Sequence, residues 1–410
     1  MIQTLRDLRK VPHFYQLFFA RTVSNFGNGI SPVALAFGVL AIDGADAGSL
    51  SLVMVSRTLP VLLLLLAGGT FADKFGRAKT MGWADILLGF LILIVAASFI
   101  VDSPSVLLLV VVGVLSGILN GIWYPAFSGL TPIIVPNEKL QSANSAIGFG
   151  SNIAFMLGTA SGGLVVSTLG TGWALGIDAL TFLVAGAMIL PLAKLPQPGQ
   201  VTAGDKVSFL HELKVGWKEF SSRSWLVIIV LGFAFVNLNF EATWAVLGAL
   251  QTLEAYDGAA SWGLILGFMS VGFLLGTLIA NRVRPRRPLR FIMMLMLAEP
   301  VFLLLFGLGA PLLFVLISAI CMGIALDVFY VIWMTTIQQN VPEESLSRVN
   351  SYDTFGSYVF GPLGVAIAGP VAMQIGPGTA LVIGSGISIC ALLVAFSFPS
   401  VRNLRAALTD

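Results

Sequence analysis

The basic residues of this chain fall on alternate sides of its apolar stretches, and this pattern constrains the fold more than any other feature. The sequence contains about twelve apolar stretches, each long enough to cross ~30 Å of hydrocarbon as a helix. Apart from Arg21 and Arg57, which lie inside such stretches, every lysine and arginine falls in every second polar segment. In the intervening segments the only charged residues are acidic, namely Asp43, Asp46, Asp102, Glu254 and Asp257. This positive-inside pattern predicts a multi-pass membrane protein with both termini cytoplasmic.

The composition supports a membrane protein. Charged residues make up 10% of the chain and apolar residues 57%, whereas a soluble domain has about 25% charged residues. The net charge of +2 is too small to indicate nucleic-acid binding. We therefore expect the basic residues to neutralise lipid headgroups, and the lipid bilayer to be the main partner of the chain.

The apolar stretches predict an all-α membrane protein. Runs of about twenty apolar residues without alternation exclude a β-barrel, and helices are the other structure that satisfies the backbone in lipid. We place the spans near residues 14–42, 48–72, 80–101, 105–134, 140–168, 173–192, 225–250, 260–281, 289–308, 311–333, 346–372 and 377–399.

The longest polar segment divides the chain into two halves. We expect an N-terminal six-helix bundle over residues 1–192, a cytoplasmic linker over 193–223 and a C-terminal six-helix bundle over 224–410. Pro196 and Pro198 break a helix at the start of the linker. Apolar side chains then recur at helical spacing, at Leu210, Leu213, Trp217 and Phe220. This stripe predicts an amphipathic helix on the inner leaflet, or a linker helix packed on the protein.

The two halves resemble each other in sequence. Aligning Tyr124 with Tyr330 also aligns Val135-Pro136 with Val341-Pro342, and Gly170 with Gly376. Because the copies are separated by an even number of helices, both cross the membrane in the same direction. Such a parallel repeat predicts two pseudo-symmetric bundles with a binding site near the midplane between them.

A short polar segment between spans two and three carries a family resemblance. The residues from Gly69 to Lys79 read GTFADKFGRAK and include Gly69, Asp73, Gly76 and Arg77. This segment resembles the loop between the second and third helices of the major facilitator superfamily. The segment from Gln338 to Ser351 resembles the drug/proton antiporter-3 branch, which includes macrolide and siderophore exporters. The resemblance implies a twelve-helix monomer that moves a small molecule by alternating access, with protons as the coupling ion.

The same resemblance assigns a gating role to this loop. It implies that Asp73 meets the N-terminus of span eleven when the cytoplasmic side closes. A carboxylate at a positive helix end gains ~0.3–1 kcal/mol, which suits a latch that must reopen. We add Asp353, near the cytoplasmic end of span eleven, to the gating residues, although it could also be solvated or cap a helix. Alternatively, Arg77 and its basic neighbours only fix the topology.

Two departures from the family pattern concern proton coupling. Gly117 stands in span four where relatives often carry an arginine, and Thr159 stands in span five where proline is usual. The sequence therefore lacks two residues that the best-known arrangement for proton antiport uses.

Ionisable residues inside the spans are functional hypotheses, because a charge at the bilayer centre costs roughly 2.5–3.5 kcal/mol. They are Arg21, Arg57, Asp85, Asp178, Glu241, Glu299, Asp327 and Asp353. Polar residues share one helical face on each of spans one, four, seven and ten. The resemblance implies that these four helices line the central cavity. We predict that the substrate contacts Arg21, Asn25, Asn28, Asn120, Tyr124, Asn237, Trp244 and Tyr330. Alternatively, the asparagines form interhelical hydrogen bonds and the aromatic residues are ordinary packing residues.

Glu241 and Asp327 are the predicted proton-coupling residues. A neutral acid costs less to bury than a carboxylate, so each could take up a proton when the cavity loses water. Two alternatives remain open: the pair could attract a cationic substrate, or Arg21 could neutralise one of the two.

Other function classes fit less well. The phosphate-binding loop of ATP-driven pumps is absent from the sequence, and no cysteine or histidine cluster predicts a metal, a cofactor or an enzyme. The leading hypothesis is therefore a secondary transporter that exports a drug-like, macrolide-like or siderophore-like molecule. The alternatives are an importer of a small nutrient, and a membrane sensor or scaffold without transport activity.

Overall fold

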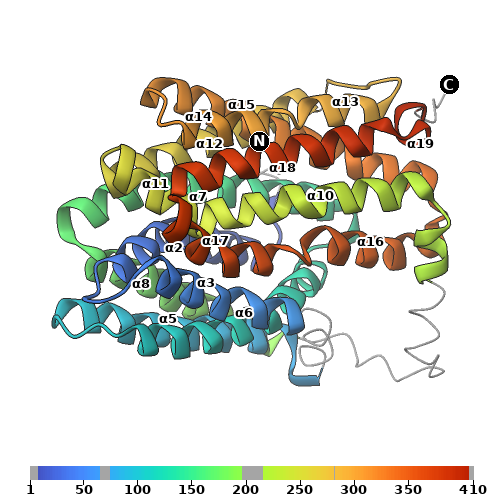
Figure 1. Ribbon diagram of the computed structural model, residues 1–410. Coiled ribbons are helices and arrows are strands. Elements are labelled where there is room, and N and C mark those ends of the chain that lie inside the picture. Colours follow the sequence, from blue (N-terminus) through green and yellow to red (C-terminus); the bar gives the residue numbers. More distant parts are fainter. Residues whose placement is uncertain (1–7, 65–73, 196–215, 281, 406–410) are drawn as a thin grey trace. The chain divides into compact units, whose positions relative to one another are not determined.

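The structure is a computed structural model that describes residues 8–64, 74–195, 216–280 and 282–405 (Figure 1). These residues are almost entirely helical and contain no strand. Twelve of their helical segments are long and apolar enough to cross a membrane. The predicted fold class, an all-α protein with twelve transmembrane helices, is confirmed.

The described helices cluster into two compact units. One contains Met1–Thr202 with Asp257–Gly267, and the other contains Ala203–Tyr256 with Phe268–Asp410. The bundle and linker boundaries predicted from the sequence stay a prediction. In the linker, residues 216–221 are helical, and Phe220 is buried beside Trp217 and Tyr352. The predicted linker positions Leu210 and Leu213 lie outside the described residues.

Six long helices form the first unit. They are α2 (Phe14–Leu40), α3 (Ala47–Leu64), α5 (Arg77–Ile100), α6 (Val106–Ile134), α7 (Leu140–Leu169) and α8 (Thr171–Ile189), with short 3₁₀ turns η1 (Asn137–Lys139) and η2 (Leu190–Lys194). The closest packing joins α2 to α7 and α8, α3 to α6, and α5 to α8. Glycine permits the approach of α2 to α7, because a Cβ on Gly29 would lie 2.8 Å from the backbone nitrogen of Thr159. Small residues serve this purpose between membrane helices, where no hydrophobic force drives association.

The second unit contains shorter segments. They are α10 (Ser224–Ala242), the π-helical segment η3 (Thr243–Leu247), α11 (Gly248–Ala255), α12 (Gly258–Ala280, of which residues 258–267 cluster with the first unit), α13 (Pro288–Leu295), α14 (Ala298–Gly307), α15 (Leu312–Asn340), α16 (Glu343–Tyr358), α17 (Gly361–Ile375), α18 (Pro377–Ser397) and α19 (Pro399–Arg402).

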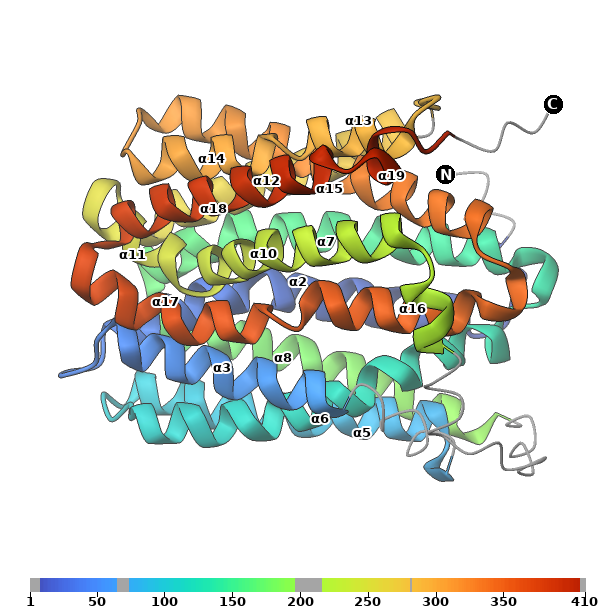
Figure 2. The same cartoon turned by 45° about the vertical axis from the view of Figure 1, so that its right-hand side comes forward.

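Three spans of the second unit are interrupted. A π-helical segment follows α10, α13 is separated from α14, and α16 is separated from α17, which continues along the same line (Figure 2). Proline explains two of the breaks. Pro300 lies in the first turn of α14 and Pro362 in that of α17, where a helix tolerates the missing N–H. Interrupted helices expose backbone polar groups, so they occur where a cavity or another helix can satisfy them.

The internal repeat is visible in the backbone of both units. Val135 after α6 and Val341 after α15 are both extended, with φ −112° and −120°, as expected before proline. Gly170 and Gly376 both have positive φ, 88° and 80°, and each immediately precedes a helix. The side chains of Tyr124 and Tyr330 are 53% and 59% exposed. The sequence repeat therefore sets equivalent helix ends in the two units.

Apolar side chains cover much of the outer surface. Leu107, Leu63 and Leu278 are each more than 60% exposed, although a soluble protein would bury most leucines of this kind.

Some spans extend beyond their predicted ends. The tenth continues to Asn340 instead of 333, because its polar last turn stays helical until the residue before Pro342 ends it.

Candidate functional site

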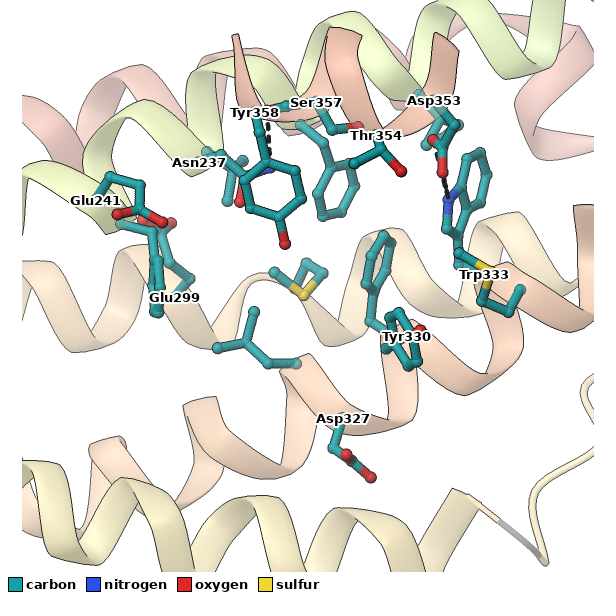
Figure 3. Close-up of a pocket in the computed structure, with 18 of the residues that line it drawn as sticks. Asn237, Glu241, Glu299, Asp327, Tyr330, Trp333, Asp353, Thr354, Ser357 and Tyr358 are labelled. Carbon is teal, nitrogen blue, oxygen red and sulfur yellow. Dashed lines mark hydrogen bonds between the residues drawn. The ribbon is translucent and has the colours of Figure 1, made fainter. Parts of the chain in front are cut away.

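A cavity of about 390 Å³ lies inside the second unit (Figure 3). It is lined by residues of α10, α12, α15 and α16, and by Met296 and Glu299 at the break between α13 and α14. The volume lies within the ~300–1,000 Å³ typical of small-molecule sites. The interrupted spans therefore surround a space large enough for a ligand.

Four carboxyl groups line this cavity without a basic partner. They belong to Glu241, Glu299, Asp327 and Asp353, and no lysine, arginine or histidine is among the described residues that line it. The spans of the second unit contain one basic residue, Arg290, which is exposed at the start of α13. Carboxylates without a counter-ion are costly in a low dielectric. A proton or a cationic ligand is therefore needed to neutralise them.

Aromatic rings form one wall of the same cavity. Phe233 and Phe329 are stacked with their centroids 4.2 Å apart, and Phe329 stacks on Trp333 at 6.1 Å. Flat aromatic faces bind apolar groups and attract cations through the ring quadrupole. Aromatic faces together with carboxyl groups therefore favour an amphipathic ligand that carries positive charge.

Five residues predicted from the sequence meet in this cavity: Asn237, Glu241, Asp327, Tyr330 and Asp353. Glu241 packs on Gly361, the first residue of α17, where a Cβ would lie 3.1 Å from its Cγ. It also directly precedes Ala242 and the π-helical segment. Such segments often occur at functional sites. Asp327 lies against Gly276 of α12, where a Cβ would lie 2.8 Å from the Cβ of the aspartate.

Two of these residues also make specific hydrogen bonds. The amide of Asn237 donates to the carbonyl of Ser357 at 2.9 Å, which satisfies a backbone group freed by the break between α16 and α17. The indole N–H of Trp333 lies 3.2 and 3.1 Å from the two carboxyl oxygens of Asp353. Asp353 was predicted as a gating residue; the structure places its side chain in the cavity, 4% exposed.

Trp244 does not line this cavity in the described structure. Its ring is half-buried and stacks on Phe240 with the centroids 5.7 Å apart. Trp244 is the second residue of the π-helical segment, which begins two residues after Glu241. Conversely, sequence periodicity missed Glu299, Trp333 and Tyr358 as lining residues. Of these, only the acidic character of Glu299 marked it in the sequence.

In the first unit, Arg21 lies over two aromatic rings. Its guanidinium carbon is 4.2 Å from the centroid of Trp123 and 4.5 Å from that of Phe127, and these rings are stacked on each other. Its Nη1 donates to Ser24 at 3.3 Å, and Arg21 also interacts electrostatically with Asp85 and Tyr124. Arg21 therefore has partners within its own unit.

A second arginine of the first unit also has an acidic partner. Arg57 on α3 interacts electrostatically with the fully buried Asp178 on α8. Gly117 packs directly on this region, because a Cβ there would lie 3.1 Å from Pro60 and 3.2 Å from the carbonyl carbon of Arg57. The position where relatives often carry an arginine therefore has no room for a side chain in this structure.

The predicted asparagines of the first unit bond within their own helices. Asn25 donates to the carbonyl of Arg21 at 2.8 Å, and Asn120 donates to that of Ser116 at 2.9 Å. Asn28 is half-buried on the same helix as Asn25. These bonds leave the carboxamide oxygens of Asn25 and Asn120 as acceptors. Contact of the three with a substrate stays a prediction.

Comparison with known proteins decides the family. The profile of the Major Facilitator Superfamily matches residues 17–365, which is most of the chain. The chain belongs to this superfamily. It is therefore a membrane transporter of small molecules and not an enzyme.

Similar transporters cover almost the whole chain. The multidrug efflux pump Tap of Mycobacterium tuberculosis is 28% identical over 417 residues, which cover 98% of this chain and 97% of the pump. The enterobactin exporter EntS of Citrobacter koseri is 25% identical and covers 87% of this chain and 86% of its own length. The crystal structure of a mutant nucleoside transporter NupG superposes with a TM-score of 0.77 at 15% identity, over 94% of this chain and 99% of that chain.

The superfamily loop lies partly inside the described structure. Gly69 and Asp73 lie outside the described residues. Gly76 has a φ of 90°, which favours glycine, and directly precedes α5. Arg77 begins α5, and its guanidinium lies against Gly129 of α6. The gating role of these residues stays a prediction.

Among the described residues, no three histidine, cysteine or acidic side chains are placed to hold a metal ion.

Proposed function

We propose that this transporter exports a small amphipathic cation in exchange for protons by alternating access. The observation that carries the proposal is the cavity of the second unit, which combines aromatic faces with four carboxyl groups and has no basic residue among its described lining. A substrate cation and a proton can each neutralise such a carboxyl group, but they exclude each other there. This competition is the physical basis of antiport, because binding of one releases the other.

Export is supported by the relatives, which are named as a multidrug efflux pump and an enterobactin exporter. The cavity does not suit an anion, since four carboxyl groups would repel it when ionised. We therefore favour a lipophilic cation over an anionic siderophore as the substrate. The energy then comes from the proton gradient, because the sequence lacks the phosphate-binding loop of ATP-driven pumps.

We assign the following roles within this proposal. Glu241 and Asp327 exchange protons, and Gly69, Asp73, Gly76, Arg77 and Asp353 gate the cytoplasmic side. The substrate passes Arg21, Asn25, Asn28, Asn120, Tyr124, Asn237, Trp244 and Tyr330. The protein works as a monomer in a bacterial inner membrane. Both of its termini are cytoplasmic, as the distribution of basic residues indicates.

The test is ethidium efflux from cells that overexpress the protein, with an imposed proton gradient. The parent should lower ethidium accumulation, and Glu241→Gln and Asp327→Asn should return it to the level of cells without the transporter. Glu254→Gln is the matched control, because this exposed acid of α11 lies outside the cavity. If both cavity variants still export like the parent, these acids do not couple transport.

Two other outcomes would favour the alternatives. Accumulation of a solute in intact cells down the proton gradient would indicate an importer. Purified protein that produces no solute flux in liposomes, but binds a partner when a ligand is present, would indicate a sensor.

A further inference from the structure

Glu299 is the most deeply buried acid of the cavity. Its side chain is 0% exposed, and it lies in the first turn of α14, directly after the break in its span. It lines the cavity, at the end away from Trp333 and Asp353, in the view of Figure 3. The proton-coupling residues assigned above do not include it.

A chain of hydrogen bonds fixes one oxygen of Glu299. The amide nitrogen of Asn239 donates at 3.0 Å to the carbonyl of Gly384, which can only accept, and at 3.0 Å to the hydroxyl oxygen of Ser388. Ser388 therefore accepts from Asn239 and uses its own proton to donate to Oε1 of Glu299, at 3.3 Å. This polarity makes Oε1 an acceptor.

The other oxygen, Oε2, is buried and has no hydrogen-bond partner among the described residues. A carboxylate there would have no counter-ion. Among the described residues, those that line the cavity with Glu299 or bond to it include other acids, tyrosines and a hydroxyl but no base: Glu241 from α10, Asp327 and Tyr330 from α15, Asp353 and Tyr358 from α16, and Ser388 from α18. In this conformation, a proton on Oε2 removes the uncompensated charge.

We propose that Glu299 is a proton-exchanging residue of this transporter, with its proton on Oε2 and with Oε1 held by the hydroxyl of Ser388, which Asn239 orients. The proposal extends the proton antiport proposed above to a residue that the sequence pattern did not select. In the exchange step, the O–H bond at Oε2 breaks, the proton passes to water in the cavity, and a carboxylate remains.

The surroundings suit both forms of the acid. Burial favours the neutral form, whereas the hydroxyl of Ser388 and the positive N-terminal end of α14 favour the carboxylate. A cavity of about 390 Å³ has room for the water that accepts the proton, since one water needs about 30 Å³. Glu299 can therefore lose its proton when water from the cavity reaches Oε2, while Ser388 keeps its bond to Oε1.

The experiment is an infrared pH titration of the purified full-length protein, which follows the carbonyl band of protonated carboxyl groups. The parent should lose one component of this band as the pH rises, and Glu299→Gln should lack that component. Ser388→Ala keeps the acid but removes the hydrogen bond to Oε1, so the component should shift to higher frequency. The control Glu254→Gln should match the parent. Because Ser388→Ala retains the acid, it tests the assignment even if Glu299→Gln does not fold.

The proposal is overturned if Glu299→Gln has the same pH-dependent band as the parent, or if the band does not shift in Ser388→Ala. A second measurement separates this result from the proposed function: a pH-indicator dye follows proton release when tetraphenylphosphonium is added. Release by the parent and a smaller release by Glu299→Gln would support both proposals. A titrating Glu299 band without tetraphenylphosphonium binding would support the proton site and count against a cationic substrate.

Discussion

The two units of this transporter treat buried charge in different ways. In the first unit, the two arginines deep inside the spans each interact electrostatically with an aspartate: Arg21 with Asp85, and Arg57 with Asp178. In the second unit, four carboxyl groups line one cavity that has no basic residue among its described lining. The charges of the first unit can compensate one another within the fold. Those of the second require a proton or a cation from outside, which is what a coupled transporter must bind and release.

The internal repeat shows that this difference does not come from the backbone. The repeat aligns helix ends in the two units, yet the position equivalent to Asp353 is the buried Ile147, and the position equivalent to Asp327 is Gly121. The same helical framework therefore accepts either apolar or acidic residues at these positions. The side chains, and not the backbone, therefore decide which unit carries acids without a basic partner among the described residues.

The largest expected effect is on the arginine–aspartate pair of α3 and α8. Asp178→Asn should destabilise the protein by ~2.5–3.5 kcal/mol, because Arg57 lies inside a span, where a charge without a counter-charge is costly, and arginine cannot lose its proton. Arg57→Met should cost less, since Asp178 can neutralise itself by taking up a proton. The double variant should recover most of the stability of the parent. Chemical unfolding of the purified protein measures all three.

Asp85→Asn gives a control within the same unit. Arg21 keeps its contacts with Trp123 and Phe127 in this variant, so the loss of stability should be smaller than for Asp178→Asn. Equal stability of Asp178→Asn and the parent would remove the contrast between the two units.

The next effect concerns the hydrogen bonds of the indole of Trp333. Trp333→Phe removes the donor that lies 3.2 and 3.1 Å from the oxygens of Asp353. An intramolecular hydrogen bond contributes ~0.5–1.5 kcal/mol, and we expect a loss of this size in thermal unfolding. Trp225→Phe is the control, because Trp225 packs edge-on against Trp333 with a centroid distance of 5.8 Å. If both variants lose the same stability, the effect is packing alone and Asp353 is not stabilised by the indole.

Sequence patterns predicted the spans well because hydropathy and charge distribution act along one helix at a time. They also selected Asn237, Glu241, Asp327 and Tyr330, which meet in one cavity, because these residues lie on polar faces of α10 and α15. Neither of these signals requires knowledge of which helices touch.

The same patterns could not predict contacts between helices. Glu299 bonds to Ser388, which is 89 residues away, so no periodicity within its own span could reveal the pair. The partners of Arg21 and Arg57 lie on other helices as well. The π-helical segment that follows α10 likewise has no reliable signature in a single sequence.

The next prediction concerns Asp46, whose carboxylate lies outside the membrane and is expected to contribute less to stability. Asp46 is exposed before α3, and its Oδ1 accepts from the backbone N–H of Ser49 at 2.8 Å and from its hydroxyl at 2.9 Å. The bond from the backbone N–H of Ser49, followed by that from its hydroxyl, lowers the pKa of Asp46 below its usual 3.8. Asp46→Ala should cost ~1 kcal/mol, as for other helix caps.

The pH dependence of this cap follows from the lowered pKa. A carboxyl group with a lower pKa in the folded state contributes stability above the unfolded value of 3.8, and loses it as the pH falls through the folded-state pKa. The stability difference between the parent and Asp46→Asn should therefore be constant at neutral pH and change only below 3.8. A difference that already changes near neutral pH would contradict the assigned hydrogen bonds.

The smallest expected effect gives the sharpest test of the contrast between the units. Glu241→Gln should leave the free energy of unfolding within ~1 kcal/mol of the parent, because glutamine has the same shape as the neutral acid and no basic residue loses a partner. Asp178→Asn is an equally conservative change, so the difference between the two variants reports only whether a counter-ion is present. Thermal unfolding of both variants under one condition measures it. A loss of ~3 kcal/mol or more in Glu241→Gln would mean that Glu241 is ionised and paired in the folded protein, and the second unit would then hold its charge as the first one does.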